Sequence, residues 1–131
     1  MTESFPDIEI YIRKPDTSSV LAWLGSIFES VDASAKGRRT LIKLESPNGI
    51  VDCVLLPDAV KGNFASLWFK SANTPWKTDR DCALEAFSQL HQEVRCSTIG
   101  WESDEKENEE ESEETWLQIT EDGESMISWL T

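Results

Sequence analysis

The stretch "IEIYIRKPD", Ile8 to Asp16, gives the first indication of the fold. Its three isoleucines, Ile8, Ile10 and Ile12, alternate with polar or charged residues, and this period of two is typical of a strand with one buried face. Pro15 has no backbone N–H to donate to a neighbouring strand, so the strand should stop before it. We therefore expect a half-buried β-strand at the start of the chain.

The residues that follow carry a helical pattern. Apolar side chains from residue 16 to residue 31 are spaced three and four apart, behind Asp16 or Thr17 as a possible N-cap. This spacing predicts one amphipathic helix that includes Val31 and ends before a loop at Gly37.

Further strands and a second helix are predicted from local signals. Ser46-Pro47-Asn48-Gly49 separates two β-branched runs as a hairpin turn would, and Thr78 precedes an amphipathic stretch with acids in its first turn. The expected elements are a hairpin over residues 40–56, a strand in 63–71, a helix in 78–92, a strand in 93–101 and a terminal hairpin in 115–131.

The terminal hairpin is centred on Asp122-Gly123. If these two residues form the loop, Trp116 lies opposite Trp129 and the two indoles form a cross-strand pair. A short helix over residues 125–130 is the alternative.

These elements follow the order βαββ-βαβββ. Mainly antiparallel strands with two amphipathic helices imply an α+β fold in which both helices cover one face of a sheet, and the ferredoxin-like arrangement is the nearest common one. A length of 131 residues suits a single domain over residues 1–131.

The alternative arrangement is a duplicated βαβββ unit. With the turn and strand Asp122-Gly123-Glu124-Ser125-Met126-Ile127, it resembles the glyoxalase and bleomycin-resistance superfamily. That resemblance implies two similar modules and a metal site, but the histidine ligands of the family are absent, because the single histidine, His91, lies on the second predicted helix.

An acidic segment, residues 102–114, separates the expected strand in 93–101 from the terminal hairpin. It holds nine acidic residues and one lysine, a charge of −8 out of the −13 of the whole chain. Such a segment repels itself and has no apolar surface to bury, so we expect a flexible loop. It serves either solubility or the recruitment of a basic protein surface.

Composition excludes several partners and compartments. A net charge of −13 argues against binding a nucleic-acid backbone, and the one basic cluster, Lys36, Arg38 and Arg39, is small. No apolar stretch is long enough to span a bilayer. Three cysteines without metal-ligand spacing suit a reducing compartment, so we expect a cytoplasmic protein.

No residue pattern predicts catalysis, a metal site or a cofactor. Cys96 follows His91 by five residues, but the expected helix and strand point these side chains apart. The acidic segment lacks the glycine and the alternating ligands of a calcium loop. We predict no catalytic residue, and the chain is expected to be a binding protein more than an enzyme.

Tryptophans are the candidate contact residues. Trp68 shares a face with Phe64 in its strand, so we expect it in the core. Trp76 follows Pro75 in a loop outside both periodic elements, where it either anchors a partner or packs on the start of the helix. The predicted partner-binding residues are Trp76, Glu107, Glu109, Glu110 and Glu111.

Three functions remain open at this point. The first is a small acidic interaction or regulatory module that binds a protein partner with a basic surface. The second is a small-molecule-binding protein with a tryptophan-lined pocket. The third is an enzyme that uses buried carboxylates or a thiol.

Overall fold

The computed structural model describes residues 7–47, 49–60, 63–71, 74–97 and 115–128. Its elements are β1 (Ile8–Arg13), α1 (Thr17–Gly25), β2 (Ser30–Lys36), β3 (Arg39–Ser46), β4 (Gly49–Val60), β5 (Phe64–Phe69), α2 (Asp79–Leu90), β6 (Val94–Ser97), β7 (Thr115–Thr120) and β8 (Gly123–Ser128). The predicted acidic segment lies outside the described residues.

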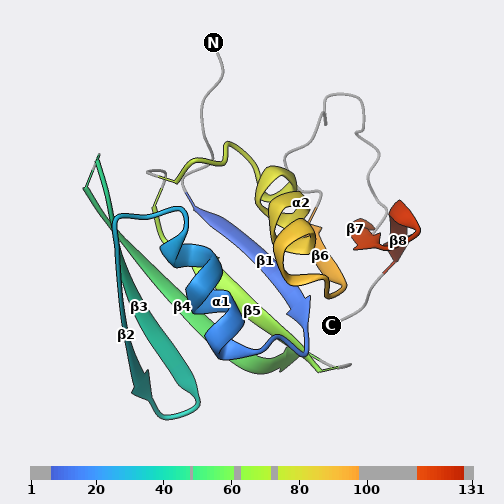
Figure 1. Ribbon diagram of the computed structural model, residues 1–131. Helices are drawn as coiled ribbons and strands as arrows, with labels where there is room; N and C mark the ends of the chain where they lie inside the picture. The colour runs from blue at the N-terminus through green and yellow to red at the C-terminus, as the bar shows by residue number, and fades with distance from the viewer. Residues whose placement is uncertain (1–6, 48, 61–62, 72–73, 98–114, 129–131) are drawn as a thin grey trace.

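The eight strands form one antiparallel sheet in the order β2-β3-β4-β5-β1-β6-β7-β8. Figure 1 shows both helices over the same face of this sheet, and α1 contacts α2. The expected α+β architecture with a mainly antiparallel sheet is therefore confirmed. The strand order differs from the predicted one, and neither the ferredoxin-like nor the glyoxalase-like arrangement is confirmed.

One predicted element is wrong. The helix expected as far as Val31 ends at Gly25, and residues 30–36 form the additional strand β2. The N–H of Ser26 donates to the carbonyl oxygens of Ala22 and Trp23, which closes the helix. The strand was missed because β2 lies at the edge of the sheet, with exposed side chains on both faces from Asp32 onward, so it shows no apolar alternation.

Other local predictions are confirmed. Ile8, Ile10 and Ile12 are fully buried beneath the helices, as their alternation indicates. Asp16 caps α1 by accepting a hydrogen bond from the N–H of Ser19, and Thr78 caps α2 by accepting one from the N–H of Asp81. Because α2 connects β5 to β6 across the intervening strand β1, the core lies between the helices and these central strands.

The terminal hairpin forms, but its predicted register is wrong. Thr120 pairs with Gly123, so the loop is Glu121-Asp122, and Trp116 faces Ile127 instead of Trp129. The positive φ of 110° at Gly123 explains the difference, because glycine adopts this conformation without strain and thereby sets the end of the turn. Residues 125–128 belong to the strand β8 and not to the alternative helix over 125–130, whose last two residues lie outside the described residues.

Candidate functional site

The candidate site is the sheet surface opposite the helices, which we call the open face. In β1, the side chains of Glu9 and Tyr11 lie on this face because the alternate isoleucines point to the helices. Directly paired residues of neighbouring strands share a face. The open face thus carries Glu9, Tyr11, Leu41, Lys43, Asp52, Val54, Phe64, Ser66, Trp68, Arg95 and Gln118.

Its most exposed aromatic residue is Trp68, which is 37% exposed. The indole N–H donates to Oδ2 of Asp7 at 2.8 Å, and Nζ of Lys70 lies 4.9 Å from the ring centroid. Glu9 is the cross-strand neighbour of Trp68 on β1. The core position expected for Trp68 is wrong, because the helices cover only the opposite face of β5.

The carboxylate of Glu9 on β1 accepts hydrogen bonds from two hydroxyl groups of the open face. Oε2 of Glu9 accepts hydrogen bonds from the Ser66 hydroxyl at 2.6 Å and from the Tyr11 hydroxyl at 3.3 Å. Burial and then the nearby charge of Glu9 raise the pKa of Tyr11 to about 12, so its phenol stays protonated at neutral pH. The hydrogen bonds thus fix the side chains of Glu9, Tyr11 and Ser66, and they do not prepare Tyr11 to act as a general base.

A second polar cluster lies beside β6. Oε2 of Glu93 accepts from Nε of Arg95 at 2.9 Å and from the Gln118 amide at 2.6 Å. The Arg95 guanidinium also lies over the ring of Phe64, 4.6 Å from its centroid, which buries that phenylalanine on the open face. Each of these charged groups has an internal partner, so the cluster is structural.

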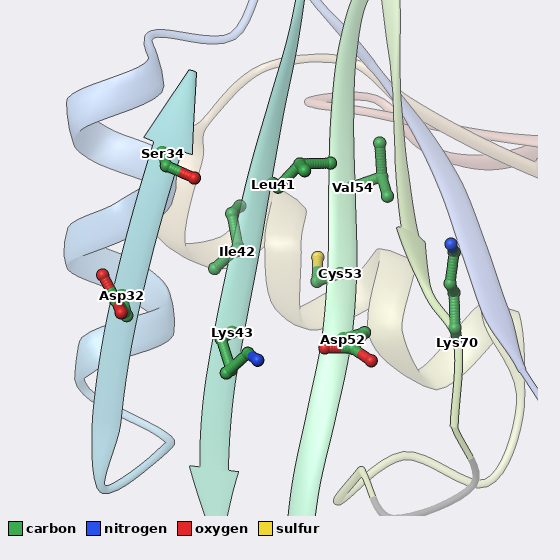
Figure 2. A pocket seen from close by; sticks show the side chains of 9 residues that line it. All are labelled: Asp32, Ser34, Leu41, Ile42, Lys43, Asp52, Cys53, Val54 and Lys70. Atoms are coloured by element: carbon green, nitrogen blue, oxygen red, sulfur yellow. The ribbon is translucent and has the colours of Figure 1, made fainter. Parts of the chain in front are cut away.

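The charged side chains of the pocket shown in Figure 2 differ from this cluster in their ion pairing. The pocket has a volume of about 410 Å³ on the β2 to β5 part of the open face, and its lining includes a row of four alternating charges, Asp32, Lys43, Asp52 and Lys70. Within the described part of the chain, none of the four forms an ion pair within 4.0 Å. No tryptophan belongs to the described lining, which differs from the tryptophan-lined pocket expected from sequence.

Trp76 lies in the core, where it is 4% exposed. Its ring packs against Trp23 and Phe69 at centroid distances of 5.7 and 5.1 Å. Glu85 on α2 accepts hydrogen bonds from both indoles, at 3.0 Å from Trp76 and 3.3 Å from Trp23. The structure thus places Trp76 in the core and Trp68 on the exposed surface of the sheet.

The remaining predicted partner-binding residues, Glu107, Glu109, Glu110 and Glu111, lie outside the described residues. In sequence they lie between β6 and β7, whose ends pair through Ser97 and Trp116. Trp116 packs edge-on against Tyr11, with ring centroids 5.6 Å apart.

The thiols and one carboxylate have perturbed acidity. Burial raises the pKa of all three cysteines, that of Cys96 to about 12, so the thiols stay protonated. Burial also raises the pKa of Asp79 to about 7, even though its Oδ1 accepts a hydrogen bond from the N–H of Glu9 at 3.3 Å. Asp79 is half-buried at the start of α2, on the helix side of the sheet.

Groups of histidine, cysteine or carboxylate side chains that could hold a metal are absent from the described residues. None of the helices described is both long and apolar enough to cross a bilayer. Comparison with models of protein families, with curated proteins and with solved structures gives no match for this chain.

Proposed function

We propose that this chain is a non-catalytic interaction module that binds a protein partner with a basic surface on its open face. The observation that carries the proposal is the exposed Trp68, which donates to the Asp7 carboxylate and pairs across the strands with Glu9, on a sheet surface that no described helix covers. Tryptophan is the residue type most enriched among interface anchors.

Charge supports a basic partner. The chain carries −13, and −8 of it lies in residues 102–114, whose ends join adjacent strands beside Trp116 and Tyr11. Long-range attraction would accelerate association and make it depend strongly on salt. The protonated thiols and the internally bonded Glu93 cluster agree with a binding role, and free buried cysteines suit the reducing cytoplasm.

The test uses the full chain as bait. Retained proteins are identified, purified and measured for association and dissociation rates at low and high salt. We expect a basic partner that dissociates faster from Trp68→Leu and associates more slowly with a chain whose nine acids in 102–114 are replaced by glutamine. Glu45→Gln, on the same face but away from Trp68, is the control. If no purified candidate distinguishes Trp68→Leu from the control, the open face is not the docking surface.

A second candidate function rests on the pocket of Figure 2. Its alternating charges, Asp32, Lys43, Asp52 and Lys70, have no ion-pair partner among the described residues, and they match a small zwitterion that carries an ammonium and a carboxylate group. Free amino acids would then raise the melting temperature of the native chain, and Lys43→Met would remove that effect. Equal shifts for both chains would contradict binding at this pocket.

A further inference from the structure

The aromatic face of Trp68 already holds a cation from its own chain. Nζ of Lys70 lies 4.9 Å from the ring centroid, two residues along the same strand direction, and both side chains are exposed. The indole N–H donates to Asp7, which fixes the orientation of the ring whose face Lys70 occupies.

The carboxylate of Asp52 belongs to a residue next to Lys70 but forms no ion pair with it. Asp52 on β4 accepts the backbone N–H of Lys70 at 2.8 Å through its carbonyl oxygen, so the two residues are immediate neighbours. Their side chains form no ion pair within 4.0 Å, and Figure 2 shows Lys70 extended away from Asp52. Lys70 therefore contacts the ring and forms no ion pair with Asp52, whose cross-strand neighbour on β3 is Lys43.

We propose that the face of Trp68 is a receptor for an arginine or lysine side chain of the partner, and that Lys70 occupies this receptor until the partner binds. The inference deepens the proposed function and rests on it. On binding, the cation of the partner takes the ring, Asp7 and Glu9 lie within its electrostatic reach, and the Lys70 ammonium turns to the Asp52 carboxylate. The displaced charge is thereby neutralised.

This exchange predicts an unusual effect of a charge deletion. Lys70 competes with the ligand for the ring, so its replacement by methionine, which keeps the apolar stem, should tighten the binding of a cationic ligand. An exposed cation–π contact corresponds to about a two- to five-fold change in affinity. Lys43 carries the same charge in the same pocket but makes no cation–π contact with a ring of the described residues, so Lys43→Met is the matched control.

The experiment titrates the full chain, labelled with ¹⁵N, with hexa-arginine and follows the indole N–H resonance of Trp68. That resonance is assigned by its loss in Trp68→Leu, and reading it alone excludes binding to the acidic segment. We expect saturable shifts with hexa-arginine and none with hexa-citrulline, which is uncharged. The dissociation constant should fall about two- to five-fold in Lys70→Met and less than about two-fold in Lys43→Met.

The role of Asp52 has its own pair of variants. Asp52→Asn removes the acceptor for the displaced Lys70 and should weaken hexa-arginine binding at Trp68, whereas Asp32→Asn, at the far end of the same charged row, should have less effect. A Trp68 resonance that hexa-arginine does not move, or equal changes for the two lysine variants, would overturn the proposal.

Failure of this inference is distinct from failure of the proposed function. A purified partner that needs Trp68 but binds Lys70→Met and Lys43→Met alike contradicts the cation exchange and leaves the interaction module intact. A Trp68 resonance that responds to hexa-arginine as expected, in a chain that retains no protein, supports the cation receptor and contradicts the protein-binding role.

Discussion

Replacement of Asp79 by asparagine should make the protein more stable above neutral pH. Asp79 lies at the first position of α2, half-buried, and burial raises its pKa from an ordinary 3.8 to about 7. The positive end of the helix dipole favours the charged form, and the hydrogen bond from Glu9 does so too, but desolvation is the larger effect.

The sign follows from proton linkage. The folded state binds the Asp79 proton more tightly than the unfolded state, so this group contributes most to stability below about pH 4, and the contribution is lost as the pH rises to about 7. A difference of about 3 pH units at about 1.4 kcal/mol each gives about 4 kcal/mol. Because Asp79 is partly solvated, we halve this value to about 2 kcal/mol.

Asparagine keeps the carbonyl oxygen that accepts the Glu9 N–H but has no charge to desolvate. Urea unfolding at pH 4.5, 6 and 8 should therefore give a free-energy difference between Asp79→Asn and the unaltered chain that grows by about 2 kcal/mol from acid to alkaline pH. Titration of the other acids is common to both proteins and cancels. The control is Asp81→Asn, in the same helical turn but exposed.

Two results would refute this reasoning. A difference that stays constant with pH would mean that Asp79 titrates alike in the folded and unfolded states. The same pH trend in Asp81→Asn would assign the effect to the helix terminus instead of to burial.

Three further measurements test the packing. Trp76→Ala should lower the free energy of urea unfolding by about 3–5 kcal/mol, whereas Trp68→Ala should cost less than about 1 kcal/mol, because only the first side chain is in the core; similar losses would contradict the assigned burial. Glu85→Gln should cost about 1–2 kcal/mol, since an amide offers one acceptor to two buried indoles, and Glu45→Gln should be neutral in the same assay. A disulfide-exchange reagent such as Ellman's should label no cysteine of the native chain within minutes at pH 8 but all three in urea, and rapid native labelling would argue against protonated, buried thiols.

Much of the local structure could be predicted because its signals are local. The alternation in β1 and the caps Asp16 and Thr78 act through the same residues that display them, and they are found where expected. The strand β2 could not be found in this way, because its pairing with β3 supplies the hydrogen bonds while its side chains stay in solvent.

The exposure of Trp68 and the burial of Trp76 could not be read from local sequence, for a physical reason. β5 is buried at every position except Trp68, so its sequence shows no alternation that separates the covered face from the open one. The burial of Phe64 on the open face depends on Arg95, about thirty residues away, and the burial of Trp76 depends on Glu85 and on Trp23 from the other helix. Contacts between distant segments decide these positions, and no local pattern reports them.

The position of β1 has a consequence for synthesis on the ribosome. This strand is made before the other described strands, yet it lies inside the sheet between β5 and β6. In a nascent chain the three isoleucines of β1 are therefore exposed. One edge of β1 lacks its hydrogen-bonding partner until β5 has been made as far as Phe69, and the other edge lacks its partner until β6 has been made as far as Ser97. Pairing of β1 thus waits for distant segments, and its apolar side chains stay open to aggregation in that interval.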